Sequence, residues 1–173
     1  MWIPKLIVTD IDGVWTDGGM FYDQHENELK KFNTYDSAGI LFARKSNIPV
    51  AIITGEDTHI MKRRAEKLKI ELLFMGINDK LGCLELLCRQ QNVDMSDVAF
   101  IGDDLNDIAV IEQVGFAACP SSAPAYIQSI VDIVMKKKGG EGVFREFVEH
   151  LLGIHSLDDV KRLLKSARLS YEQ

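Results

Sequence analysis

The sequence predicts an α/β fold built on a doubly wound, parallel sheet. Three short apolar segments, at 6–8, 50–53 and 98–101, have the composition of strands buried on both faces. Segments with a helical spacing of apolar residues lie between them, and this alternation favours the crossover connections of parallel strands. A chain of 173 residues suits one domain with a substantial core.

A small β-hairpin flap is expected after the first strand. Asp17 and Gly18 stand between apolar and aromatic residues, which is a strong hairpin signal. Further polar turn residues follow at 23–27, and residues 29–32 are expected to extend the flap as another short strand. Asp36 or Ser37 is then expected to cap a helix that carries Ile40, Leu41 and Ala43.

The remaining elements alternate along the chain. Strands are expected at 50–53, 72–74, 98–101, 116–118 and 130–134. Helices are expected at 57–69, at 143–152 and from 157 to about Ser170; one more helix begins at Lys80, and another follows the loop at 102–107 and ends at about Gln113. Ser156 and Asp159 have the spacing of a capping box before the last helix.

Composition and charge restrict the partners and the compartment. The apolar fraction of 46% is that of an ordinary globular domain, and the net charge of −6 argues against a nucleic-acid or anionic-membrane partner. An anionic substrate stays possible, because a metal ion reverses the local charge. The first apolar run is too short for a secretion signal, no segment approaches a membrane span, and three cysteines lack any C-x-x-C, so we expect reduced thiols and a cytoplasmic location.

Four predicted strands end in polar residues. Asp10 and Asp12 follow the first strand two residues apart, so their side chains are expected to project from the same end of it. The other three strand ends carry Thr54 and Gly55; Lys80; and Asp103, Asp104, Asn106 and Asp107. Because the carboxyl ends of parallel strands meet at one edge of the sheet, we expect these side chains to form a single site.

Each of these residues also has a simpler explanation when taken alone. Asp10 or Asp12 suits a turn, Thr54 a helix N-cap, and Lys80 an exposed helix start, while Asp103 and Asp104 suit the positive end of a helix dipole. The simpler explanations account for each residue separately, but not for all of them occurring at the ends of neighbouring strands.

The order D-x-D, Thr, Lys and G-D-D-x-x-D, each at a strand end, resembles the four motifs of the haloacid dehalogenase superfamily of phosphohydrolases. The resemblance implies a Rossmann-like sheet and a magnesium-dependent phosphatase that works through an aspartyl-phosphate. It places the phosphatase domain, flap included, at residues 1–153 and leaves residues 154–173 as a C-terminal helical tail whose role the sequence does not indicate.

The resemblance also assigns roles to the carboxylates. It makes Asp10 the nucleophile, and Asp12 the acid that protonates the leaving oxygen and then the base that activates water. It implies a Mg²⁺ held by Asp10, the backbone carbonyl of Asp12, and Asp103. The chemistry requires such a cation, because a carboxylate attacking a phosphate dianion meets like charge and a lysine alone supplies one positive charge.

The phosphate is expected to be received by the other motif residues. By the same resemblance, Thr54 and the backbone N–H of Gly55 receive the phosphoryl oxygens, and Lys80 neutralises them. Asn106 and Asp107 are expected to position the phosphate, Lys80 or a water on the metal.

A phospho-acceptor switch is the alternative from a different functional class. Receiver-like switches also combine an acidic cluster, a Thr or Ser and a Lys on a parallel sheet. Asp12 argues against a switch, because a general base beside the acyl phosphate would promote its loss. Receivers also carry the phospho-acceptor on a later strand than the first.

The spacing of the motifs leaves no room for a cap domain. The capless layout, the opening V-T-D-I-D-G-V-W-T-D-G and the late K-G-G-E-G-V-F-R-E-F together resemble the 3-deoxy-D-manno-octulosonate 8-phosphate phosphatase family. The resemblance implies a small sugar acid phosphate as substrate and a homotetramer. It also implies that a segment near 140–145 lines the site of the next subunit.

One departure from that family concerns the substrate. Octulosonate phosphatases usually continue the second motif as T-G-R, whereas this chain has Glu56. Glu56, with Arg64 and Lys67 on one face of the next helix, resembles the branch that acts on 2-keto-3-deoxy-D-glycero-D-galacto-nononate (KDN) 9-phosphate. The two basic side chains can bind the carboxylate of a sugar acid, and the Glu56 carboxylate can accept hydrogen bonds from sugar hydroxyl groups. We therefore expect the nine-carbon substrate, with the eight-carbon substrate as the alternative.

Aromatic residues in the expected flap point to assembly. Trp15, Met20, Phe21 and Tyr22 are too many apolar side chains for a small hairpin to bury within itself. We expect them to form an exposed apolar patch through which flaps pair in the tetramer.

Overall fold

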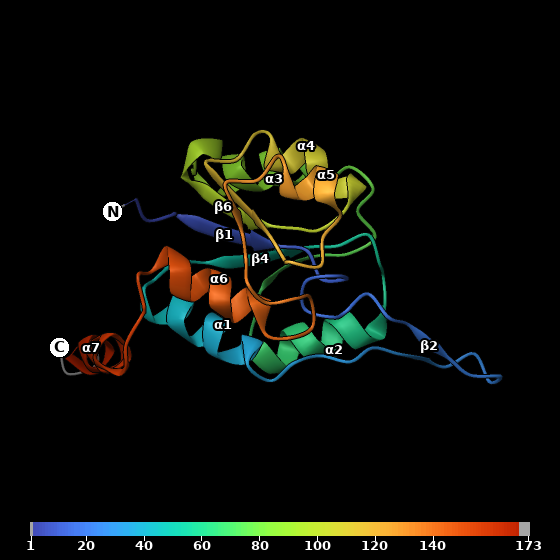
Figure 1. Ribbon diagram of the computed structural model, residues 1–173, viewed down its shortest axis with the longest axis horizontal. Coiled ribbons are helices and arrows are strands. Elements are labelled where there is room, and N and C mark those ends of the chain that lie inside the picture. Colours follow the sequence, from blue (N-terminus) through green and yellow to red (C-terminus); the bar gives the residue numbers. More distant parts are fainter. Residues whose placement is uncertain (1, 170–173) are drawn as a thin grey trace.

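A six-stranded parallel sheet forms the centre of the molecule, in a computed structural model that describes residues 2–169 and the side chains of residues 2–165 (Figure 1). The strand order is β5-β4-β1-β6-β7-β8. The strands are β1 (Leu6–Thr9), β4 (Val50–Ile53), β5 (Leu72–Phe74), β6 (Val98–Ile101), β7 (Phe116–Cys119) and β8 (Ile133–Val134). The doubly wound α/β fold is therefore confirmed, and the last strand is shorter than the expected 130–134.

Helices cover both faces of this sheet (Figure 1). One layer contains α1 (Asp36–Lys45), α2 (His59–Leu68) and α6 (Val143–Leu151), and the other contains α3 (Lys80–Gln91), α4 (Ile108–Ile111) and α5 (Ala125–Gln128). The last helix, α7 (Leu157–Leu169), contacts α1, and the capping box of Ser156 and Asp159 is present. Short 3-10 helices at Met95–Asp97 and Leu105–Asp107 complete the helices of residues 2–169. Ser170, the expected end of the last helix, lies outside the described residues.

The central strand β1 is buried on both faces. Ile7 belongs to the core beneath α1 and α6, whereas Leu6 and Val8 belong to the core beneath α3 and α4, and all three are 0% exposed. This two-sided burial explains why the strand reads as a continuous apolar run instead of alternating with polar residues.

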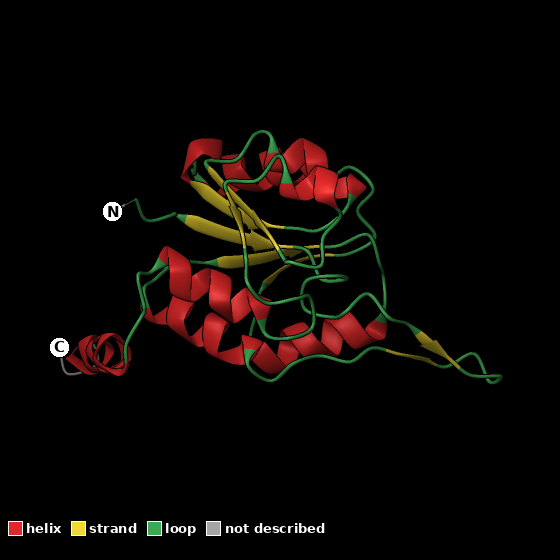
Figure 2. Cartoon of the chain, viewed as in Figure 1, coloured by secondary structure: helices red, strands yellow, loops and turns green. Residues whose placement is uncertain are grey.

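The flap is a two-stranded antiparallel hairpin, and its turn is the later of the two turn segments that the sequence indicates. Strands β2 (Phe21–Tyr22) and β3 (Glu28–Leu29) pair with each other and project away from the domain (Figure 2). The turn covers 23–27, where the Asp23 carboxylate accepts the backbone N–H groups of His25 and Asn27 at 2.7 and 2.9 Å. The hairpin predicted at Asp17-Gly18 was wrong, whereas the predicted turn at 23–27 is confirmed, because the Asp23 side chain stabilises it. The strand after the turn is Glu28–Leu29 and not the expected 29–32.

Trp15 belongs to the core and not to the flap. Its side chain is 0% exposed and stacks on Phe144 of α6 at 4.7 Å between ring centroids. The indole N–H donates to Thr9 Oγ1 at 3.0 Å, which satisfies the polar edge of the ring. The exposed aromatic surface of the flap consists of Phe21 and Tyr22, which are 63% and 70% exposed.

The segment 140–145 packs against its own subunit. Gly140 donates its N–H to Val14 O at 2.9 Å and accepts the side-chain amide of Asn33 at 3.0 Å. Val143 and Phe144, at the start of α6, are 0% exposed. Val143 and Phe144 therefore belong to the core of their own subunit, whereas Glu141 is exposed and Arg145 is half-buried. The expected contribution of this segment to a neighbour's site stays a prediction.

Asp36 is not the N-cap of α1. It is the first residue of that helix, and its Oδ1 accepts the backbone N–H of Arg145 at 3.2 Å, near the N-terminus of α6. The side chain is 0% exposed, and Oδ2 has no hydrogen-bond partner among the described residues. Burial raises the pKa of Asp36 to about 6, although the N–H of Arg145 opposes the shift.

The described part of the chain contains no disulfide and no membrane-spanning helix. Cys83, Cys88 and Cys119 are free, as expected. No helix within residues 2–169 is both long enough and apolar enough to cross a bilayer.

Asp36→Asn is expected to remove a pH-dependent cost of burial. A folded-state pKa raised from 3.8 to about 6 means that the folded protein loses stability as pH rises through that interval. The difference in unfolding free energy between variant and wild type should therefore increase from pH 4.5 to pH 8, by at most about 2 kcal/mol. Denaturant unfolding at several pH values measures it, with the exposed Asp94→Asn as the control. An identical pH dependence in wild type and Asp36→Asn would contradict this account.

Candidate active site

The predicted site residues gather where the sheet reverses its strand order. β1 connects through the flap to α1 on one face, whereas the loop after its neighbour β6 leads to α4 on the other face. Such a switch point leaves a crevice outside the carboxyl ends of the strands. A cavity of about 520 Å³ opens there, lined by Asp10, Asp12, Gly13, Asp17, Gly18, Met20, Thr54, Gly55, Glu56, Asp103, Asp104, Leu105, Asn106 and Ser122.

The cavity lining is strongly acidic. Six of its side chains are carboxylic acids, and no lysine or arginine is among the described residues that line it. Two lysines approach these acids from within the protein: Lys80, at the start of α3, and Lys30, directly after β3. The charge balance of the site therefore depends on buried cations and on any cation that the cavity binds.

Lys80 joins the loops after β1 and β6. Its side chain is 1% exposed, and Nζ lies 2.9 Å from Asp10 Oδ2 and 2.7 Å from Asp107 Oδ1. The other oxygen of Asp107 accepts the backbone N–H of Asp103 at 2.9 Å. Burial alone lowers the pKa of Lys80, but the charges of Asp10 and Asp107 outweigh it and the net pKa is raised. Lys80 is therefore a fixed positive charge at the base of the site.

Two carboxylates of the site resist ionisation in the metal-free protein. Burial, reinforced by the charge of Asp107, raises the pKa of Asp10 to about 7 despite Lys80. Burial and the charge of Asp10 raise the pKa of Asp103 to about 8. Both shifts have the cause expected for like charges held close together in a poorly solvated place.

The geometry fits a hard divalent cation. One oxygen each from Asp10, Asp103 and Asp107 lies within 4.8 Å of the others, and the buried Asp103 Oδ1 accepts no hydrogen bond from the described residues. Gly13, at φ +84°, makes this approach possible, because a Cβ there would lie 1.8 Å from Asp103 Oδ2. Carboxylate oxygens are the ligands that Mg²⁺ prefers.

Thr54 lies at the same edge, after β4. It is 1% exposed, its N–H donates to Phe74 O at 2.9 Å, and its Oγ1 accepts the N–H of Glu56 at 3.4 Å. The N-cap position of α2 belongs to Thr58, so Thr54 is not the cap of that helix. Gly55 and Glu56 follow Thr54 into the cavity lining.

Arg64 and Lys67 do not reach this cavity in their own subunit. The Arg64 guanidinium lies over the rings of Trp15 and Phe32, and it donates to the backbone carbonyl of Asn33 at 3.1 Å. Lys67 is exposed on α2. The two residues share a helix, as expected, but the structure brings only Glu56 of the three to the cavity lining.

Lys30 and Thr16 are contacts of Asp12 that the sequence analysis missed. Lys30 Nζ lies 2.7 Å from Asp12 Oδ2, and Thr16 Oγ1 donates to Asp12 Oδ1 at 3.2 Å. Neither residue belongs to the four motifs. Lys30 reaches Asp12 because the flap folds back toward the end of β1, and no local sequence pattern indicates this contact between residues 18 positions apart.

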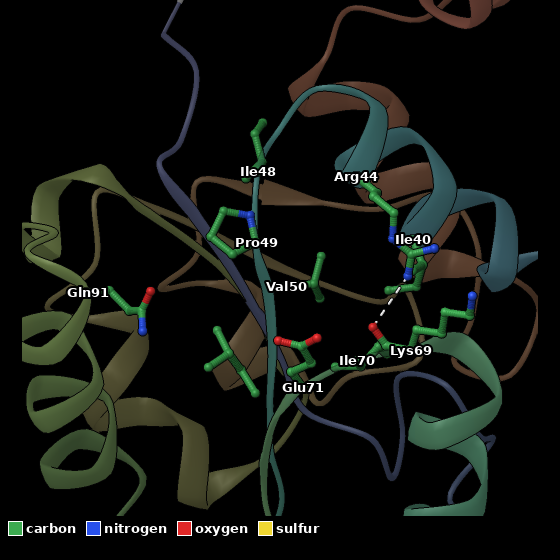
Figure 3. A pocket seen from close by; sticks show the side chains of 10 residues that line it. Ile40, Arg44, Ile48, Pro49, Val50, Lys69, Ile70, Glu71 and Gln91 are labelled. Atoms are coloured by element: carbon green, nitrogen blue, oxygen red, sulfur yellow. Dashed lines mark hydrogen bonds between the residues drawn. The ribbon is translucent and has the colours of Figure 1, made fainter. Parts of the chain in front are cut away.

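A second cavity opens at the opposite ends of the strands. It has a volume of about 370 Å³ and lies where β4 and β5 begin, between the ends of α1, α2 and α3 (Figure 3). Arg44 points toward the end of α2, where it donates to the carbonyls of Leu68 and Lys69 at 2.6 and 3.4 Å. This cavity is remote from the active-site carboxylates, and the hydrogen bonds of Arg44 go to the carbonyl groups at the C-terminal end of α2.

Comparison with known proteins places the chain in a family. Residues 78–147 match the model of the haloacid dehalogenase-like hydrolases. The 3-deoxy-D-manno-octulosonate 8-phosphate phosphatase of Haemophilus influenzae is 34% identical over 169 residues, which cover 95% of this chain and 93% of that protein.

Solved structures agree with this placement. The phosphatase of the same name from Yersinia pestis superposes with a TM-score of 0.84 at 36% identity, covering 86% of this chain and 80% of the other. The Moraxella catarrhalis phosphatase, crystallised with magnesium, phosphate and 3-deoxy-D-manno-octulosonate (KDO), superposes with a TM-score of 0.84 at 33% identity, covering 87% and 86%. The chain therefore belongs to the haloacid dehalogenase superfamily and to the family that contains the capless 3-deoxy-D-manno-octulosonate 8-phosphate phosphatases, and it is a magnesium-dependent phosphoric monoester hydrolase.

Proposed function

We propose that the protein hydrolyses the phosphate ester of a 2-keto-3-deoxy sugar acid, with KDO 8-phosphate as the first candidate. The relative that is 34% identical over 95% of the chain is named for this activity, and this similarity carries the proposal. An open cavity of about 520 Å³ is consistent with a small anionic sugar.

Asp10 acts as the nucleophile in this proposal. Its carboxylate attacks phosphorus, the bond from phosphorus to the sugar oxygen breaks, and Asp12 gives that oxygen a proton. Water then attacks the aspartyl-phosphate, Asp12 takes the proton of the water, and phosphate and free Asp10 are released. The approach of both aspartates to one cavity supports this assignment.

The phosphoryl group is held by the surrounding donors. Lys80, 2.9 Å from Asp10, supplies a positive charge beside the reacting oxygens, while the Thr54 hydroxyl and the Gly55 N–H donate to them. Asn106 also lines the cavity, and Asp107 fixes Lys80. Asp10, Asp103 and the backbone carbonyl of Asp12 would hold Mg²⁺, which offsets the negative charge of nucleophile and phosphate.

KDN 9-phosphate is the second candidate substrate. The comparisons favour the eight-carbon substrate, and the specific observation for the nine-carbon one is Glu56, which stands where arginine is expected and lines the cavity. The expected basic partners of Glu56, Arg64 and Lys67, lie outside the cavity lining of this subunit.

Assembly and location remain proposals. The exposed Phe21 and Tyr22 of the flap support pairing between subunits, and Trp15 no longer contributes to that argument because it is buried. We keep the homotetramer and the cytoplasmic location as predictions, without a nucleic-acid or membrane partner. The division into a domain at 1–153 and a helical tail at 154–173 is kept in the same way.

Nucleophile and acid should be separable by mutation. Asp10→Asn is expected to abolish phosphate release from KDO 8-phosphate, because no acyl phosphate can form. Asp12→Asn should lower kcat by roughly 10²–10⁴ through loss of acid–base help. A phosphate-release assay with Mg²⁺ measures both, and full activity of Asp10→Asn would exclude Asp10 as the nucleophile.

Magnesium should stabilise the protein more at high pH than at low pH. The pKa values of Asp10 and Asp103 are raised from 3.8 to about 7 and about 8, so the metal-free protein loses stability as pH rises from about 4 to about 8. Mg²⁺ must displace these protons, so the increase in unfolding temperature on adding it should be larger at pH 8 than at pH 6. Thermal unfolding in EDTA and in Mg²⁺ measures this, and Asp103→Asn should flatten the metal-free profile. An equal increase in unfolding temperature on adding Mg²⁺ at pH 6 and at pH 8 would contradict this coupling between metal binding and proton release.

The two substrates can be distinguished through Glu56. We expect a higher kcat/KM for KDO 8-phosphate than for KDN 9-phosphate. The alternative outcome, a preference for the nine-carbon substrate that Glu56→Arg narrows or reverses, would establish the second candidate. Glu71→Arg, away from the active-site cavity, is the matched control for the charge change.

A further inference from the structure

A buried lysine of the flap contacts Asp12. The Lys30 side chain is 0% exposed, and its Nζ lies 2.7 Å from Asp12 Oδ2. The next acid, Glu28, is 4.0 Å away. Taking an ammonium out of water costs several kcal/mol unless a close partner compensates it. Asp12 is therefore the group that allows Lys30 to be buried there.

This contact leaves Asp12 held at both oxygens. Oδ1 accepts the hydroxyl of Thr16 at 3.2 Å, and Thr16 is 0% exposed in the turn after the nucleophile. Asp12 itself lines the active-site cavity and is 23% exposed, so it stays accessible to a ligand. Two buried donors on one carboxylate give it a defined orientation while part of it faces the cavity.

We infer that Lys30 is a positioning residue that orients Asp12 for proton transfer to the leaving oxygen. The inference rests on the proposed function, in which Asp12 is the general acid. Such transfer needs a distance of about 2.6–3.2 Å between heavy atoms, and a misplacement of about 1 Å can cost on the order of 10² in rate. Because Lys30 directly follows β3, the same contact links the flap to the chemistry.

The leaving group distinguishes this role from the two others that a buried lysine can have. p-Nitrophenolate departs without a proton, whereas a sugar alkoxide needs one from Asp12. A positioning role predicts a loss only with the sugar phosphate. A purely structural ion pair predicts equal losses with both substrates, and a contact to the sugar acid predicts a change in KM.

The experiment measures phosphoryl transfer to Asp10 in single turnovers, at saturating KDO 8-phosphate and at saturating p-nitrophenyl phosphate, with Mg²⁺. Lys30→Met should lower the rate about 10- to 100-fold with the sugar phosphate and less than about threefold with the aryl phosphate. Lys30→Arg, which keeps a charged donor, should restore most of the loss. The aryl phosphate rate in the same sample reports the fraction of folded enzyme.

Lys31 provides the matched control. It is the next residue of the same segment, is 68% exposed, and pairs with Asp17 at 3.2 Å. Lys31→Met removes the same charge and side chain and should leave both rates unchanged.

Three results would overturn the inference: equal losses with both substrates, no loss with either, or an effect confined to KM. The proposed substrate fails separately, if wild-type enzyme turns over the aryl phosphate but not KDO 8-phosphate. In that case KDN 9-phosphate replaces KDO 8-phosphate in the comparison with the aryl phosphate. The positioning role then requires that Lys30→Met lower the rate with KDN 9-phosphate and not with the aryl phosphate.

Discussion

The crowding of carboxylates at one edge of the sheet is the interaction on which the rest of the site depends. Two like charges about 4 Å apart repel by about 1 kcal/mol in water and about 4 kcal/mol at an effective dielectric constant of 20. Asp10, Asp103 and Asp107 are this close, and Lys80 supplies one buried positive charge among them. Burial raises the pKa values of Asp10 and Asp103, and the neighbouring carboxylates raise them further. A divalent cation completes the charge balance.

The fold holds these charges together by fixing the loops that carry them. Lys80 is the first residue of α3, and Asp79 caps that helix by accepting the N–H of Gly82 at 2.9 Å. Asp107 bonds to the backbone of the loop after β6, and a Cβ on Gly102 would lie 2.4 Å from its carboxylate. The site is therefore prepared before any ligand arrives, which is the arrangement that electrostatic catalysis requires.

Asp12 depends on a different part of the molecule. Lys30 reaches it from the flap, while the exposed aromatic residues of the same flap form a surface suited to another subunit. In the proposed tetramer, contacts made by the flap with a neighbour would act on the acid–base residue through this ion pair. The nucleophile, in contrast, is fixed by the central sheet and α3.

The sequence by itself determined the sheet, the order of its elements and the residues of the motifs. Buried strands appear as apolar runs, and ligands bind at the carboxyl ends of parallel strands, so local patterns suffice for both conclusions. The same patterns predicted a hairpin at Asp17-Gly18 that the structure does not have, misplaced the cap of α1 and Trp15, and missed Lys30. The tertiary structure decided these positions, because each depends on a partner remote in sequence or on competition between neighbouring turns. Asp36 meets Arg145, Trp15 stacks on Phe144, and Lys30 pairs with Asp12. Whether a polar or aromatic side chain is buried depends on what covers it, and only the packed chain supplies that cover.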